Sequence, residues 1–118
     1  MSVYEHINMM NDMYQTGKIV GTPVFGYTIR QTPILKMQLL VNEPNQNKDG
    51  KCFKYRIPVV TFRDTAIQYK NMQDGQVISI HGYMTSFTHT RKGGFQYTTM
   101  EVVAQQIEIE DDPDGERT

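Results

Sequence analysis

The sequence has few of the residues expected in a protein exported from the cell or held in a membrane. Among its 118 residues there is one cysteine, Cys52, and no tryptophan. A single cysteine excludes an intrachain disulfide, which favours a reducing compartment. No apolar run approaches the roughly 18 residues that indicate a membrane span, and the N-terminus lacks the basic and then apolar pattern of a secretion signal. We therefore expect a soluble, cytoplasmic protein of one domain.

Residues that carry catalysis or hold a metal ion are also few and scattered. The three histidines and the cysteine lie far apart, so no metal-ligand spacing is present. The acids of the central region form no constellation for a metal-dependent nuclease: Asp64, Asp74 and Glu101. A phosphate-binding Gly-Lys loop is missing as well. We expect no enzyme activity, no cofactor and no bound metal.

The net charge of −1 hides an uneven distribution along the chain. Residues 15–107 carry eleven lysines and arginines against five acids, a net charge of +6, whereas residues 108–118 carry −5 and the first fourteen residues carry −2. A basic body with an acidic end indicates a polyanionic partner, and a tail that competes for the same groove or recruits other proteins. A surface that only keeps the protein soluble explains the same distribution.

Alternation of apolar and polar residues predicts a β-rich domain over residues 15–109. Five segments have this character: 18–24, 34–42, 51–62, 76–87 and 95–109. Turn-forming residues at 43–50 and 91–94 predict two long hairpins. One helix is expected over residues 63–72, with Thr61 and Asp64 as possible capping residues.

The regions at the two ends of the chain differ from this body. Residues 1–14 show no strand alternation, so we expect a short helix or a loose arm there, and residues 110–118 form a short acidic tail. The body has three strands, a helix and two more strands, which is the order of the OB-fold, a five-stranded and partly open Greek-key barrel. The expected fold class is therefore all-β with one short helix. In this fold, the face of the second and third strands binds oligonucleotides.

The third expected strand combines the rings and the positive charges that a single-stranded nucleic acid requires. Phe53 and Tyr55 alternate with Lys54 and Arg56, and Lys51 precedes them. Stacking of a base on an aromatic ring is worth about 1–3 kcal/mol, while cations contact the phosphates. We hypothesise that the two rings stack on bases, with core packing of these rings as the alternative.

The last hairpin has the composition of a flexible basic finger, although an ordinary solvated hairpin tip has the same composition. Seven further residues are candidates because they carry a ring or a positive charge in this hairpin or beside the third strand: Lys18, Lys36, Phe87, Arg91, Lys92, Phe95 and Tyr97.

Several segments jointly resemble the bacterial and phage single-stranded DNA-binding protein family over residues 18–109. The sequences Lys-Ile-Val-Gly at 18–21, Tyr-Arg-Ile-Pro-Val-Val-Thr-Phe at 55–62 and Asp-Gly-Gln-Val-Ile-Ser-Ile-His-Gly at 74–82 resemble three strands of that family. Tyr-Thr-Thr-Met-Glu-Val-Val-Ala at 97–104 resembles its last strand. The resemblance implies sequence-independent binding and protection of single-stranded DNA in replication and recombination. It also implies a dimer or tetramer, with replication or recombination proteins as further partners and no membrane.

The chain departs from the family pattern in several places. The usual Asp-Pro pair after the first strand is missing and is replaced by Thr22-Pro23-Val24-Phe25, and Tyr55 and Phe87 stand where the family often has tryptophan. Met100 adds a residue before Glu101, which puts the facing of Tyr97 in doubt because a slip of one residue reverses the face. The short tail resembles phage-encoded members, which would work in the cytoplasm of a bacterial host.

Two other functions fit the same residues. An OB-fold adaptor would bind a protein through the acidic end and exposed strand edges. An RNA-binding OB module would stack bases by the same physics and differ mainly in its contacts to the 2′-hydroxyl.

Overall fold

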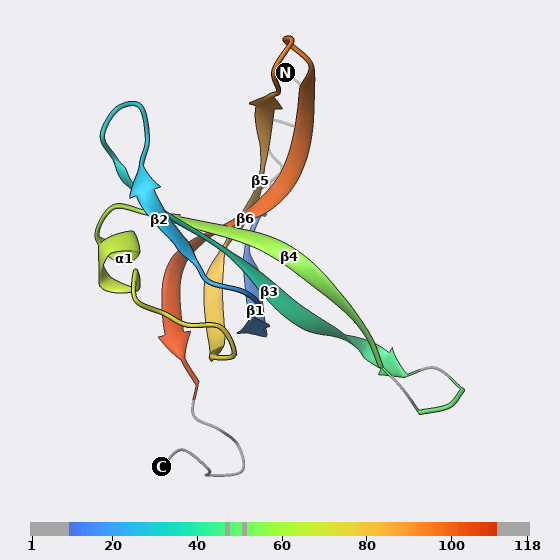
Figure 1. Cartoon of the computed structure of the whole chain (residues 1–118). Coiled ribbons are helices and arrows are strands. Elements are labelled where there is room, and N and C mark those ends of the chain that lie inside the picture. Colours follow the sequence, from blue (N-terminus) through green and yellow to red (C-terminus); the bar gives the residue numbers. More distant parts are fainter. Residues whose placement is uncertain (1–9, 47, 51, 111–118) are drawn as a thin grey trace, which may run out of the picture.

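The computed structural model describes residues 10–46, 48–50 and 52–110. In these parts of the chain it has six strands and one helix (Figure 1). The strands are β1 Met13–Ile19, β2 Val24–Tyr27, β3 Pro33–Gln46, β4 Cys52–Phe62, β5 Val77–Thr90 and β6 Gln96–Ile109, and the helix α1 is Arg63–Gln68. None of the helical segments in the described ranges is long and apolar enough to cross a membrane.

Five of the strands close into a barrel. The sheet order is β1-β5-β6-β4-β3-β2, and β1 pairs a second time with β3, which closes the ring. We call the β1–β3 and β4–β6 pairings the seams of the barrel. Both are short: β1 pairs with β3 at Lys18 and Ile19, and β4 pairs in parallel with β6 at Val59 and Val60. The predicted OB-fold barrel with one short helix is confirmed, and β2 is an additional edge strand on β3.

The core consists of every second residue of the barrel strands. On β3, Leu35, Met37 and Leu39 are buried, whereas Lys36 and Gln38 between them are exposed, as the period of two in a strand requires. Burial of each large aliphatic side chain stabilises the fold by about 1.5–3 kcal/mol. The inward residues of β3 pack against inward residues of the other strands and against the helix: Ile19, Val59, Ala66, Ile78, Ile80, Val102 and Ile107.

The first predicted strand is wrong in its extent. The expected strand at 18–24 is divided between the end of β1 and the first residue of β2. Gly21, with φ of +79°, lies between them, and its amide donates a hydrogen bond to Asp74 Oδ1 at 2.7 Å. This turn was not predicted because the residues around it are rich in β-branched side chains, which favour a strand. Gly21 adopts the positive φ of the turn without strain because it has no Cβ atom. Residues 1–9 of the expected arm and 111–118 of the acidic tail lie outside the described residues.

The helix is shorter than predicted and is not capped as expected. It ends at Gln68, and its N-cap residue is Phe62, which makes no side-chain capping hydrogen bond. Thr61, predicted to cap the helix, is instead buried and donates a hydrogen bond to the carbonyl oxygen of Ala104 at 2.7 Å. Tyr69, at the C-cap, donates its hydroxyl to the carbonyl oxygen of Ile107 at 2.7 Å. Residues on both sides of the helix are thus fastened to β6.

Replacement of Thr61 by valine should lower the free energy of unfolding by about 1–2 kcal/mol, because it keeps the shape of the side chain but leaves the Ala104 carbonyl without this donor. Urea unfolding followed by circular dichroism measures the change. Thr88→Val is the matched control, since Thr88 is exposed and its hydroxyl lies 3.2 Å from that of Thr98 across the β5–β6 pair. An equal loss in both variants would contradict the role given to Thr61.

Two hairpins extend beyond the barrel in different directions (Figure 1). One is formed by β3 and β4, whose strands run further into the expected loop at 43–50 than predicted and shift register between Asn42 and Gln46. The other is formed by β5 and β6 and is closed by a hydrogen bond from the Arg91 amide to the Phe95 carbonyl oxygen at 2.7 Å. Between these hairpins lies the outer face of β3 and β4.

Candidate nucleic-acid interface

Two adjoining cavities hollow the outer face of β3 and β4. Their volumes are 390 and 560 Å³, and Lys36, His89 and Glu101 line both. The floor comes from β3 and β4, one wall from the β5–β6 hairpin, and the other wall from β2 and the turn that follows it. We call the two cavities together the groove.

Positively charged side chains share the outer face that forms the floor of the groove. Lys36 stands opposite Val24 of β2 and Val60 of β4, so it lies between the two walls. Further along, Leu40 pairs with both Lys18 of β1 and Arg56 of β4, and Asn42 pairs with Lys54. Paired residues point to the same face of a sheet.

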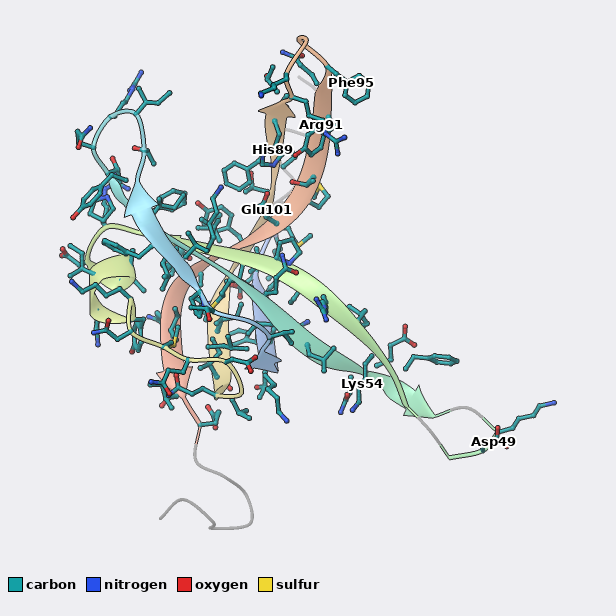
Figure 2. All side chains as sticks on the ribbon, viewed as in Figure 1. Asp49, Lys54, His89, Arg91, Phe95 and Glu101 are labelled. Atoms are coloured by element: carbon teal, nitrogen blue, oxygen red, sulfur yellow. The ribbon has the colours of Figure 1, made fainter. Side chains whose placement is uncertain are left out.

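The resulting basic row is Lys18, Lys36, Lys54 and Arg56. All four are exposed, and none forms an ion pair with another residue of the described ranges. Free cations on one surface attract a polyanion, and the attraction is screened by salt. The row leads from the groove along the β3–β4 hairpin, where Figure 2 labels Lys54.

The two rings of β4 lie on the opposite face from the cations of the same strand. Tyr55 stands opposite Val41, which is buried, so Tyr55 and Phe53 belong to the face that continues the barrel interior. They are still 41% and 60% exposed, because the hairpin extends past the barrel. The alternation that places rings between charges in the sequence separates them in space. Lys51, the remaining candidate of this strand, lies outside the described residues.

The β5–β6 hairpin carries its own group of rings and charges. The rings of His89 and Tyr97 are stacked with centroids 5.0 Å apart, and the Arg91 guanidinium carbon lies 4.9 Å from the Tyr97 centroid. Phe87 and Tyr97 line the groove. Phe95, which is 64% exposed, and Lys92 are at the tip of the hairpin, and Figure 2 shows Arg91 and Phe95 there above His89. The hairpin thus presents rings along the wall of the groove and at its tip.

A carboxylate lies at the base of this hairpin. Glu101 is only 9% exposed, and its Oε2 accepts a hydrogen bond from the Thr99 hydroxyl at 2.7 Å and lies 3.3 Å from His89 Nε2 (Figure 2). Tyr97, Thr99 and Glu101 all line the groove, as expected for alternate residues of one strand. The described parts of the chain hold no group of three or more His, Cys, Asp or Glu side chains placed to bind a metal ion.

The structure thus sorts the sequence candidates into three places. Lys36, Phe87 and Tyr97 line the groove, and Lys18, Lys54 and Arg56 continue its charge along β3 and β4. Arg91, Lys92 and Phe95 occupy the hairpin tip, while Phe53 and Tyr55 lie on the other face of β4.

Sequence reasoning did not select His89 and Glu101 as site residues. Their signal was present, since Glu101 follows Tyr97 by four residues and His89 stands opposite Tyr97 across the hairpin. A strand that presents Tyr97 to a ligand also presents Glu101. The turn after β2 was missed as a wall of the groove, which it forms through Thr28, Ile29 and Arg30.

Comparison with known proteins matches residues 10–110 to the family described as the "Single-strand binding protein family". A "Single-stranded DNA-binding protein" of Caldanaerobacter subterraneus subsp. tengcongensis is 28% identical over 100 residues, which cover 84% of this chain and 67% of that protein. One of Deinococcus radiodurans is 26% identical over 101 residues, which cover 84% of this chain and 34% of that protein.

A solved structure is similar as well. The crystal structure of a deletion variant of the single-stranded DNA binding protein from Thermus aquaticus superposes with a TM-score of 0.72 at 18% identity, over 88% of this chain and 52% of that one. At this identity the likeness shows the shared fold. The chain therefore spans about half of that structure, and two thirds and one third of the two relatives in the order given.

Proposed function

Because the chain belongs to the single-strand binding protein family, we propose that it binds single-stranded DNA along the groove and the basic row, largely independently of sequence. The observation that carries the proposal is the position of Lys36, which lies within a groove lined by rings at one end of a row of unpaired cations. Such a surface offers stacking partners to bases and positive charge to phosphates. It acts by binding, as a protective coat on strands exposed in replication and recombination, and not by catalysis.

The selectivity for single strands follows from the same chemistry. A ring on the protein stacks on the π-face of a base, and in a duplex these faces are already stacked on neighbouring base pairs. The rings best placed for stacking are Tyr97 and Phe87 in the groove and Phe95 at the hairpin tip. Phe53 and Tyr55 contribute where a bound strand passes round the β3–β4 hairpin to its other face.

The test is a fluorescence-anisotropy titration of labelled oligo-dT, the matched duplex and the matched RNA strand, each at several salt concentrations. Tight binding of oligo-dT that weakens with salt, with poor binding of the duplex, supports the proposal. Failure to bind any nucleic acid at low salt would overturn it in favour of a protein-binding adaptor. Tighter binding of the RNA strand would leave the binding surface as proposed but make single-stranded RNA the ligand.

In this assay, Tyr97→Ala should weaken oligo-dT binding by about 5- to 100-fold, because a stacking ring is worth about 1–3 kcal/mol per base. The matched control is Tyr27→Ala. Tyr27 is 60% exposed, but it lies on the same side of β2 as Phe25, whose partner Leu35 is buried, and so on the side away from the groove. Equal losses in both variants would contradict the assignment of the groove.

We further propose that the protein works as a homo-oligomer in the cytoplasm, that of a bacterial host if it is phage-encoded. Several barrels on one strand raise the apparent affinity, because binding to the second barrel is intramolecular once the first is occupied. Replication or recombination proteins that meet the coated strand are the other partners we propose.

A further inference from the structure

Glu101 stands out because it is a largely buried acid within a groove that is otherwise suited to a polyanion. All hydrogen bonds that the described residues make to it end on Oε2, which contacts the Thr99 hydroxyl and His89. Its other oxygen, Oε1, has no hydrogen-bond partner in the described ranges. Oε1 is nevertheless accessible to solvent, since no fully buried side-chain oxygen in those ranges lacks a hydrogen-bond partner. Since Glu101 lines both cavities, Oε1 opens onto the groove as a free hydrogen-bond acceptor.

The orientation of this acceptor is fixed by its neighbours. Thr99 and His89 hold Oε2 from the same hairpin, and the His89 ring is in turn stacked on Tyr97. Thr99 Oγ1 also lies 3.0 Å from His89 Nε2, so the three side chains form one connected group. A carboxylate held at one oxygen has little freedom to turn its other oxygen away from the groove.

A carboxylate in this position discriminates between the parts of a nucleotide. It repels phosphates, which the unpaired Lys36 in the same cavities attracts. It accepts hydrogen bonds from amino groups on base edges, as Glu and Asp do with the N4 amino group of cytosine. Tyr97, which lies four residues before Glu101 on the same face of β6, offers the ring on which that base would stack.

We propose that Glu101 reads base edges, so that the groove favours bases with an exocyclic amino group over thymine. Cytosine, adenine and guanine each carry such a group, whereas the single N3–H donor of thymine lies between two carbonyl oxygens that a carboxylate repels. The result is a compositional preference on top of sequence-tolerant binding. This inference rests on the proposed binding of single-stranded DNA in the groove.

The experiment compares the unmodified protein with Glu101→Gln on three labelled strands of equal length. The strands are oligo-dC, oligo-dT and an oligonucleotide of 2-pyrimidinone, which is cytosine without its amino group. The measured quantity is the ratio of the Kd for oligo-dT to the Kd for oligo-dC. It should fall by about 3- to 10-fold in the variant, because glutamine keeps the size of the side chain but accepts and donates at its amide. A ratio ensures that a general gain in affinity from the lost negative charge cancels.

Glu108→Gln makes the same change of charge at an exposed position of β6 that does not line the groove, and it should leave the ratio unchanged. The 2-pyrimidinone strand tests the idea without altering the protein, since the unmodified chain should bind it several-fold more weakly than oligo-dC. Equal ratios in the unmodified protein and Glu101→Gln, or equal binding of the 2-pyrimidinone and cytosine strands, would overturn the inference. Failure to bind any of the strands would instead contradict the proposed function.

Discussion

Replacement of Gly82 by alanine is expected to lower the free energy of unfolding by about 3 kcal/mol or more, a large part of the stability of a typical small domain. A Cβ atom at this position would lie 1.8 Å from the carbonyl oxygen of Val103 and 3.0 Å from the Cα atom of Ala104. These are backbone atoms of the neighbouring strand, so they cannot move aside as a flexible side chain can. The close approach occurs where the β5–β6 pairing shifts register between His81 and Gly82.

The measurement is urea unfolding followed by circular dichroism, with Gly26→Ala as the matched control. Gly26 also lies in a strand, but a Cβ there would meet no atom within 4 Å, and its φ is not positive. Alanine at Gly26 should leave stability unchanged or raise it slightly, since it reduces the entropy of the unfolded chain. Similar stabilities for the two variants would show that β5 and β6 do not approach each other at Gly82 as described.

The second large effect is expected on DNA binding when two members of the basic row lose their charge. Lys36→Gln combined with Arg56→Gln should weaken oligo-dT binding on the order of 50-fold at low salt and flatten the slope of log K against log salt by about 1.4. The reason is counterion release, since each phosphate neutralised on a single strand contributes about 0.7 to that slope. Both side chains are exposed and unpaired within the described residues, so the fold should be retained.

A control with the same change of charge separates this effect from a general loss of positive potential. Arg63→Gln combined with Lys70→Gln also removes one arginine and one lysine, at exposed positions in and just after α1 that do not line the groove. We expect this pair to leave the salt slope nearly unchanged. Equal slopes for the two double variants would mean that the DNA does not follow the basic row.

The barrel could be predicted from the sequence because its signals are local. Alternation of residues such as Lys36 and Met37 marks a half-buried strand, and the turn formers at 43–50 mark a hairpin without any knowledge of the partner strands. The early turn at Gly21 was not predictable in this way, since the Gly21 amide donates a hydrogen bond to Asp74, which lies far along the chain.

The candidate site depended on facts that are not local. Alternation alone shows that Tyr55 and Arg56 point to opposite faces, but only the pairing of Tyr55 with Val41 shows which face continues the barrel interior. In the same way, the added Met100 left the facing of Tyr97 open until the register of β6 against β5 placed Tyr97 opposite His89. Charge distribution indicated a polyanionic partner, whereas the groove itself is made by strands distant in sequence.

The short seams of the barrel bear on how the chain reaches its fold. The β3–β4 and β5–β6 hairpins join neighbouring segments and need only short loops to close, so they are the parts able to form early. Closure of the ring instead requires β1 to find both β3 and β5, with Lys18 opposite Leu40 and Val77, and β4 to find β6, with Val59 opposite Val102. Because the loop entropy for these distant pairings is lost before the contacts repay it, we expect the docking of β1 and of the two hairpins to set the pace of folding. Until then the apolar inner faces of both hairpins remain open to other chains, so rapid synthesis or high concentration favours aggregation at this stage.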